Sequence, residues 1–291
     1  MEHKQHTRYA RWRIMRKSDD IISLFEQFGP SSLSAYTRFE NMKAGRDRVW
    51  VLEQGKGGVL VQSGQTLYPI FVFSCPSLED ELEHLKNLKK ILKRSLDRIV
   101  LHAIQGLAED VEFLEKAIGG LGIFPEQREF YDLMVLNRVA SAESLNIGPA
   151  GLVLRPPCIA DADALFELQA GYEKEEVLTE KSVFIPAVCR LFVEQSIRGG
   201  QVLLAEYSGR IVGKVNVNAA SSTWTQIGGV YVKPEFRGLG IASRMVAVFV
   251  QGLLPGRMGV SLFVKKTNVS ARSVYRRIGF APLDTYRISY Y

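Results

Sequence analysis

Hydrophobic and polar positions divide the chain into two stretches in which the same kinds of elements follow in the same order. In the first stretch, glycine-containing breaks between β-rich runs indicate a meander of three strands, preceded and followed by apolar stripes with helical spacing. The predicted elements are helices over 5–28 and 31–39, strands over 48–53, 57–62 and 66–74, helix 77–96, strand 98–104, helix 106–122 and strand 128–137.

A small, polar, Gly/Pro-punctuated segment over residues 141–151 is typical of a linker, and the order of elements then begins again. The elements predicted after it are strand 151–156, helices 161–176 and 182–200, strands 201–207, 210–219 and 223–234, helix 238–253, strand 260–266, helix 268–279 and strand 285–291. The two stretches share an order of elements but no obvious sequence identity. This suggests a duplicated domain rather than a solenoid, whose repeats are much shorter.

Composition agrees with two domains of a globular protein. The 291 residues fit two domains of roughly 100–200 residues, and 46% hydrophobic and 23% charged residues are ordinary values. No apolar run approaches the roughly 20 residues of a membrane-spanning helix, and the basic N-terminus has no apolar segment behind it. The three cysteines form neither a metal-binding spacing nor a disulfide framework, so we predict no metal, no membrane association and a cytoplasmic location.

Residues 230–245, VYVKPEFRGLGIASRM, combine a strand, a glycine turn and a helix. The first amides of a helix have no partners inside the helix, and the helix dipole places partial positive charge there. Gly238 and Gly240 let the backbone close on an anion, and Arg237 adds a charged donor. The spacing fits neither a P-loop nor a dinucleotide fingerprint, because Ser243 replaces the third glycine of the latter. The net charge of +6 also fits an anionic ligand.

A second motif, TNVSARSVYRRIGF, follows the strand 260–266. Asn268 can cap the next helix or offer its amide to a ligand. Tyr275 lies on one helical face with Ala271, and its hydroxyl could donate a proton at a reaction centre. Taken alone, each residue also fits a purely structural role, as a cap and as a packed aromatic.

Together the two motifs resemble the GNAT superfamily of acyl-CoA-dependent N-acyltransferases. That family carries Q/R-x-x-G-x-G/A after a V-Y-V-x-P strand, and here Glu235 stands at the first position. The downstream pattern N-x-x-A-x-x-x-Y-x-x-x-G-F is complete from Asn268 to Phe280. The resemblance covers about 152–291, whereas in 1–148 only the order of elements supports it. It implies an α/β (α+β) fold of two GNAT-like domains in tandem, each with a mixed, mostly antiparallel sheet flanked by helices.

The resemblance also implies the site. The strand that ends at Val232 would separate from strand 259–264, and Tyr275 would protonate the departing thiolate after direct attack by an amine. Acetyl-CoA would be the co-substrate, without a metal. The residues implied to bind it are Val230, Tyr231, Val232, Arg237, Gly238, Leu239, Gly240, Ile241, Ala242 and Asn268. Since the strand SSTWTQIGGVYV holds no carboxylate, the base is open, with Glu173, Glu175 and Glu176 as candidates.

The matching junction of the first half, FVFSCPSLEDELEHL, lacks both glycine and arginine. Ser77 and Asp80 resemble a capping box, and the carboxylates of 79–81 would repel a pyrophosphate. We therefore predict a catalytic GNAT domain over 149–291 and a degenerate GNAT-like or accessory α/β domain over 1–148.

The acceptor is predicted to be a primary amine of a small molecule or a peptide, and a homodimer is left open. Two alternatives also stay open, a tRNA-dependent aminoacyl or peptidyl transferase of tandem GNAT type and an acyl-CoA sensor without turnover. The basic pI of about 9.2 allows the first, but the intact pyrophosphate loop favours coenzyme A over a nucleic acid.

Overall fold

A computed structural model describes residues 12–15, 19–52, 58–71, 78–96, 100–138, 148–178 and 182–291. The chain forms two compact units. Unit 1 comprises residues 1–132 and 284–291, and unit 2 comprises residues 133–283. No helix among the described residues is both long and apolar enough to pass through a bilayer.

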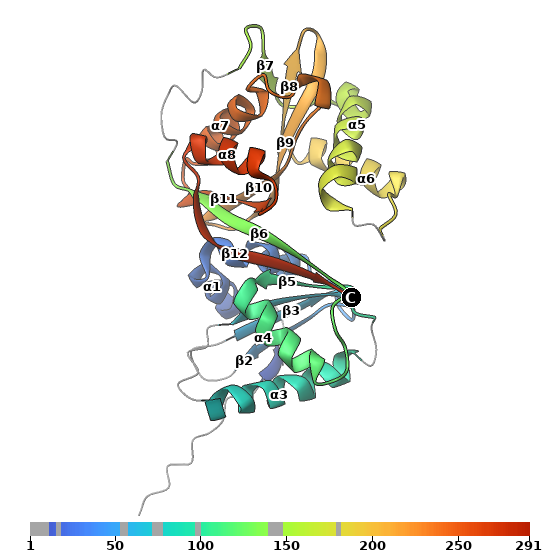
Figure 1. The fold of residues 1–291 in the computed structure, drawn as a ribbon, viewed down its shortest axis with the longest axis vertical. Helices are drawn as coiled ribbons and strands as arrows, with labels where there is room; N and C mark the ends of the chain where they lie inside the picture. Colours follow the sequence, from blue (N-terminus) through green and yellow to red (C-terminus); the bar gives the residue numbers. More distant parts are fainter. Residues whose placement is uncertain are drawn as a thin grey trace, which may run out of the picture. The chain divides into compact units, whose positions relative to one another are not determined.

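Unit 1 is built on a mixed sheet with the strand order β1-β2-β3-β4-β5-β12 (Figure 1). Its β4–β5 pair is parallel, whereas the neighbouring pairs β1–β2, β2–β3, β3–β4 and β5–β12 are antiparallel. Its strands are β1 (Trp12–Met15), β2 (Arg48–Leu52), β3 (Gly58–Ser63), β4 (Thr66–Phe71), β5 (Ala103–Leu107) and β12 (Ala281–Tyr290). Its helices are α1 (Asp19–Gln27), η1 (Gly29–Ser32), α2 (Leu33–Glu40), α3 (Leu78–Leu96) and α4 (Ala108–Gly119).

Alternating side chains of unit 1 divide its core into two layers, as the period of two in a strand requires. Trp50 and Leu60 pack with α3 and α4 on one face. Val49 and Val59 pack with α1 and α2 on the other. The strands β2 and β3 are therefore apolar on both faces.

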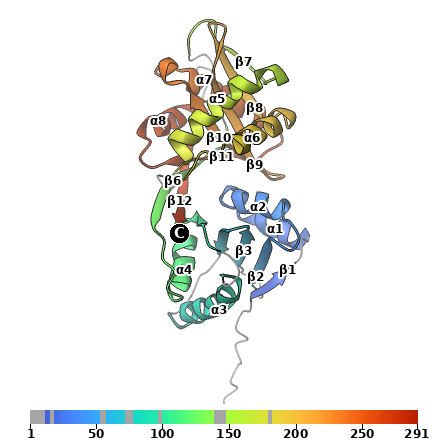
Figure 2. The same ribbon diagram turned by 90° about the vertical axis from the view of Figure 1, so that its right-hand side faces the viewer.

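Unit 2 has the strand order β6-β11-β10-β9-β8-β7, with the β10–β11 pair parallel and the pairs from β10 to β7 antiparallel (Figures 1 and 2). Its strands are β6 (Gln127–Leu136), β7 (Val153–Arg155), β8 (Val202–Tyr207), β9 (Arg210–Ala220), β10 (Trp224–Val232) and β11 (Gly259–Lys265). Its helical segments are η3 (Ile159–Asp161), α5 (Ala162–Tyr172), the π-helical turn η4 (Glu173–Val177), α6 (Pro186–Arg198), η5 (Pro234–Phe236), α7 (Ile241–Leu253) and α8 (Val269–Ile278).

Helices cover both faces of the unit 2 sheet, with α7 and α8 on one face and α5 and α6 on the other (Figure 1). The centre of the sheet is irregular at Gly228-Gly229, where the register of β10 against β9 shifts and Gly229 takes φ +58°. On the other side, β10 pairs with β11 only over Trp224–Ile227. The predicted separation of these two strands thus begins just before Val230.

The last strand in each half of the sequence lies partly in the other unit. Residues 284–290 of β12 belong to unit 1, where Tyr286–Tyr290 pair with Ala103–Leu107 of β5. Residues 133–136 of β6 belong to unit 2, where β6 neighbours β11. The domain boundary at 148/149 stays a prediction.

The predicted mixed α/β architecture is confirmed, but several elements differ from their predicted bounds. The helix expected over 5–28 is wrong at 12–15, which form β1 because Trp12 packs into the core and the segment pairs with β2. The strand expected over 98–104 begins only at Ala103, where pairing with β4 and β12 starts. The predicted capping box at Ser77 and Asp80 lies outside the residues whose side chains are described.

Candidate active site

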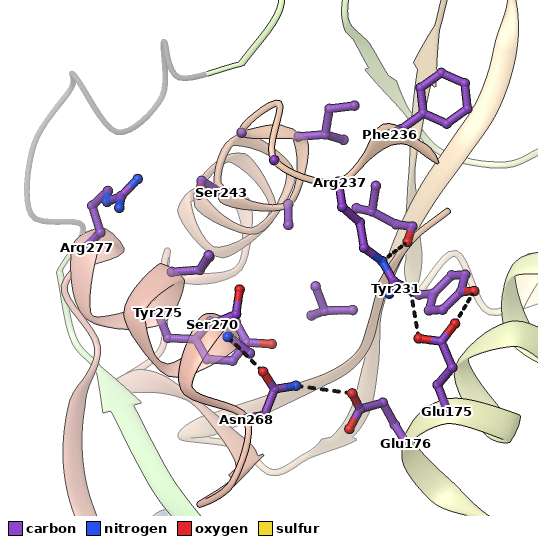
Figure 3. Close-up of a pocket in the computed structure, with 18 residues that line it drawn as sticks. Glu175, Glu176, Tyr231, Phe236, Arg237, Ser243, Asn268, Ser270, Tyr275 and Arg277 are labelled. Carbon is purple, nitrogen blue, oxygen red and sulfur yellow. Dashed lines mark hydrogen bonds and ion pairs between the residues drawn. The ribbon is translucent and has the colours of Figure 1, made fainter. Parts of the chain in front are cut away.

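A cavity of about 390 Å³ opens in unit 2 where β10 leaves β11 (Figure 3). Its walls come from the end of β10, the loop into α7, the first turn of α7, the helix α8 and the turn η4. The lining residues are Glu175, Glu176, Val230, Tyr231, Val232, Phe236, Arg237, Gly238, Gly240, Ile241, Ala242, Ser243, Asn268, Ser270, Ala271, Val274, Tyr275 and Arg277.

The N-terminus of α7 forms one wall and has the properties of an anion site. Gly238 and Gly240 both adopt left-handed backbone conformations, with φ of +81° and +79°, which side chains other than glycine rarely adopt. Gly240 is the N-cap and offers no side-chain acceptor, and the first turn contains no acidic residue. The first amides of α7 therefore lack a side-chain cap and retain their preference for negative charge.

Arg237 lies beside these amides and is held from two sides. Its Nε donates to the carbonyl oxygen of Val232 at 2.9 Å, and its guanidinium lies 5.3 Å from the centre of the Tyr231 ring. Its Nη2 pairs with Glu175 Oε2 at 2.7 Å, and Glu175 Oε1 also accepts from the Tyr231 hydroxyl at 2.9 Å (Figure 3). The carboxylate of Glu175 thus forms an ion pair with Arg237, the side chain with which an anionic ligand would pair.

Asn268 forms the opposite corner of the cavity. Its Oδ1 accepts from the amide of Ala271 at 3.0 Å, which confirms the predicted N-cap of α8. Its Nδ2 donates to Glu176 Oε1 at 3.1 Å, so the turn η4 bonds to this corner as well (Figure 3). Glu175 and Glu176 therefore connect η4 to both motifs that the sequence singled out.

Tyr275 is 7% exposed and reaches the cavity from α8. Burial is the main reason why its pKa lies well above the ordinary value, and Tyr172 and Glu176 raise it further. Burial likewise raises the pKa of Tyr172 to about 12, with a contribution from Glu176. Both phenols are therefore protonated at neutral pH and are available as donors.

The structure brings together all but one of the residues that the sequence nominated for acetyl-CoA binding and as the acid. Leu239 is the exception, since it is 45% exposed and does not line the cavity. Of the three candidate bases, Glu175 and Glu176 line the cavity, whereas Glu173 accepts from Gln169 Nε2 at 2.9 Å. Ser270 and Arg277 also line the cavity and were not predicted from the sequence.

Residues 164–280 match the family model described as the acetyltransferase (GNAT) family. Residues 164–280 form a GNAT domain. The GNAT fold supports acyl transfer, and the matched range contains every residue that lines the cavity. Among the described residues, no group of three His, Cys, Asp or Glu side chains could hold a metal ion.

Solved structures extend the likeness in fold over nearly the whole chain. A GNAT-family acetyltransferase from Colwellia psychrerythraea is similar over 97% of this chain and 100% of its own, with 10% identity and a TM-score of 0.60. A tandem GNAT protein from the clavulanic acid biosynthesis pathway is similar over 96% of this chain and 97% of its own, with 12% identity and a TM-score of 0.57. A GCN5-related N-acetyltransferase from Sphaerobacter thermophilus is similar over 96% of this chain and 95% of its own, with 16% identity and a TM-score of 0.56. No curated protein matched the sequence.

Proposed function

We propose that the protein transfers an acetyl group from acetyl-CoA to a primary amine by direct attack in a ternary complex. The observation that carries this proposal is the uncapped N-terminus of α7, which meets Arg237 and Tyr275 in one cavity of a GNAT domain. An anion-binding helix end and a protonated phenol are the two groups that a phosphorylated thioester donor requires of its site.

Each residue has a role in this proposal. The amides at 238–242 and Arg237 would hold the pyrophosphate, and Glu175 would leave Arg237 when the donor binds. The amides of Val230 and Val232, on the stretch of β10 that does not pair with β11, would bind the acyl and pantetheine arm. The donor supplies the activated acetyl group, and Tyr275 would give its proton to the departing sulfur.

The partners and the role of the first half are part of the same proposal. We expect the acceptor to be a small-molecule or peptide amine, and the protein to act in the cytoplasm without a metal. Unit 1 would be a degenerate GNAT-like domain, as the tandem arrangement of one structural relative suggests. The long alignments with solved structures support this reading of the first half.

Thioester turnover tests the proposal. The full chain is mixed with acetyl-CoA and a panel of primary amines comprising alkylamines, polyamines, lysine peptides and aminoglycosides, and the released thiol is titrated. We expect at least one amine to accelerate thiol release and to be recovered with an added acetyl group. Acetyl-CoA that binds without turnover with any amine would favour a sensor, and acetyl-CoA that does not bind at all would remove the proposal.

A further inference from the structure

The cavity has an acidic wall and a basic wall. The turn η4 supplies the acidic wall with Glu175 and Glu176. The helices α7 and α8 form the basic wall, since α7 contains one arginine, α8 contains three, and neither helix contains an aspartate or a glutamate. The positive charge of this wall is therefore not balanced within its own helices, and it favours a negatively charged ligand.

Two arginines of the described residues line the cavity, Arg237 and Arg277. They lie on different sides of it, with Arg237 after β10, Arg277 on α8 and Ser243 of the first turn of α7 between them (Figure 3). Arg237 is paired with Glu175 at 2.7 Å. Arg277 has neither a hydrogen bond nor an ion pair within the described part of the chain. Arg277 thus brings a positive charge to the cavity that these residues do not neutralise.

The helix α8 lines the cavity along its length. Ser270, Val274 and Arg277 follow one another at separations of four and three residues, so they form one stripe on the helix surface. The seven residues from Ser270 to Arg277 span roughly 10 Å along the helix axis. Asn268 is the N-cap of α8, and Arg277 lies in its last turn. The cavity wall therefore extends from the Asn268 corner to Arg277.

Tyr275 and Arg277 lie at different depths in the cavity. They are two residues apart on α8, so their side chains leave the helix in directions that differ by roughly 200°. Tyr275 is buried, whereas Arg277 is exposed and lies at the rim. In the proposed function the sulfur of the donor meets Tyr275. The end of the donor that is farthest from the sulfur would then lie toward the rim, where Arg277 stands.

The anionic groups of acetyl-CoA match this arrangement of positive charge. Its pyrophosphate lies in the middle of the molecule and suits the first amides of α7 and Arg237. Its second anionic group is a phosphate monoester on the 3′ oxygen of the ribose, at the end distant from the thioester. A phosphate monoester carries nearly two negative charges at neutral pH, and the guanidinium of an arginine can donate two parallel N–H bonds to it.

We propose that Arg277 binds the 3′-phosphate of the donor and thereby selects coenzyme A thioesters over donors without this phosphate. The inference rests on the proposed function and names the class of donor that the same site takes. Thioesters of 3′-dephospho-coenzyme A lack this phosphate, as do thioesters of phosphopantetheine, free or attached to a carrier protein. Arg277 is then a specificity residue and takes no part in the chemical step.

A purely structural role for Arg277 makes a different prediction. Basic residues in the last turn of a helix interact favourably with the helix dipole. Arg276 and Arg277 both lie in the last turn of α8 and both are exposed, but Arg276 does not line the cavity. The two arginines would share a role toward the dipole, whereas only Arg277 would recognise a ligand. Arg276 is therefore the matched control.

The test is calorimetric titration of the full chain at low salt with acetyl-CoA and with acetyl-3′-dephospho-CoA. Wild type is compared with Arg277→Met and with Arg276→Met. We expect wild type and Arg276→Met to bind acetyl-CoA about tenfold more tightly than the dephosphorylated thioester, as a charged hydrogen-bonded contact implies. Arg277→Met should bind both thioesters equally, with an affinity close to that of wild type for acetyl-3′-dephospho-CoA.

Three results would overturn the proposal while the proposed function stands. Wild type that binds both thioesters equally would show that the 3′-phosphate is not recognised. An equal loss of affinity for both thioesters in Arg277→Met would assign this arginine to the pyrophosphate instead. Loss of the preference in Arg276→Met as well would indicate the general charge of α8 rather than one contact. Wild type that does not bind acetyl-CoA would remove the proposed function itself.

Discussion

Single side chains in the cavity and in the core of unit 2 owe their charge states to burial. Tyr275 and Tyr172 are enclosed and stay protonated, and Lys214 is enclosed without a carboxylate bound to it and favours the uncharged form. A desolvated phenol can give a proton, and a desolvated amine can take one. Burial therefore favours the uncharged form of both residue types and shifts their pKa values in opposite directions.

Replacement of Tyr275 by phenylalanine removes one hydroxyl and keeps the ring that packs against Phe280. We expect the transfer rate to fall by about a hundredfold while the dissociation constant for acetyl-CoA stays nearly unchanged, because the hydroxyl acts on the leaving sulfur. Thiol release and calorimetry measure the two quantities. Tyr207→Phe, a tyrosine of β8 outside the cavity, is the matched control. A Tyr275→Phe variant as fast as wild type would exclude the acid role.

Lys214 also makes stability depend on pH. Its pKa is about 7 in the folded protein and near 10.5 when exposed, so between these values the unfolded chain binds a proton that the folded chain does not. Stability therefore rises with pH across this window, by at most about 1.4 kcal/mol per pH unit from this group. Lys214→Met lacks that rise, so its stability relative to wild type should decline from pH 7 to 10. Calorimetric unfolding measures this difference, and a difference that does not vary with pH would contradict the burial of an uncharged lysine.

Among the elements, the turn η4 pairs with Arg237, which lies beside the N-terminus of α7. Its Glu175 is paired with Arg237 across a half-exposed contact, with exposed side-chain fractions of 41% and 47%. Such a pair contributes little to folding. It nevertheless places a negative charge where the pyrophosphate would lie, so the donor must displace it.

Glu175→Gln should therefore raise the affinity for acetyl-CoA by about fivefold with little change in the melting temperature. The reason is that the amide pairs with Arg237 more weakly and does not repel the incoming phosphates. Calorimetric titration at two salt concentrations measures the affinity. Glu167→Gln, which removes an exposed pair with Lys233 outside the cavity, is the control. An affinity that falls in Glu175→Gln would mean that the carboxylate helps to bind the donor.

Local signals in the sequence predicted the elements around the cavity well. The capping asparagine and the terminal Gly279 set the bounds of α8, and the glycines before α7 marked its start. Contacts between distant segments were not readable in this way. The bond between Asn268 and Glu176 joins residues 92 positions apart, and the enclosure of Lys214 depends on α5 and α6. The sequence of β9 shows polar residues at 214, 216 and 218, but it does not show that α5 and α6 cover this face of the strand.

For the whole molecule, the order of elements predicted the tandem arrangement but not which unit receives the last strands. Residues 284–290 of β12 follow unit 2 in the sequence and complete the sheet of unit 1. Strand pairing is a long-range choice that the alternation of apolar residues does not specify. The short strand β1 was missed for the same reason, since it exists through its pairing with β2.

This assignment of β12 is testable by a substitution far in sequence from the rest of unit 1. Tyr286 is 2% exposed and pairs with Leu107 of β5. Tyr286→Ala should destabilise unit 1 by about 3 kcal/mol through the lost packing. In a Trp224→Phe background, fluorescence of Trp12 and Trp50 reports unit 1, because these are the other two tryptophans of the chain. Leu283→Ala, at an exposed residue, is the control, and an unchanged midpoint in Tyr286→Ala would contradict the assignment.

The most direct test of the central claim is calorimetric titration of the full chain with acetyl-CoA. We compare wild type with Gly240→Ala, which strains the left-handed N-cap of α7, and with Gly252→Ala, a helix position with open space around it. The account predicts saturable one-to-one binding to wild type and Gly252→Ala, and binding at least about tenfold weaker to Gly240→Ala, since left-handed backbone costs about 1–2 kcal/mol outside glycine. Absence of saturable binding to wild type, or equal affinity in all three proteins, would contradict it.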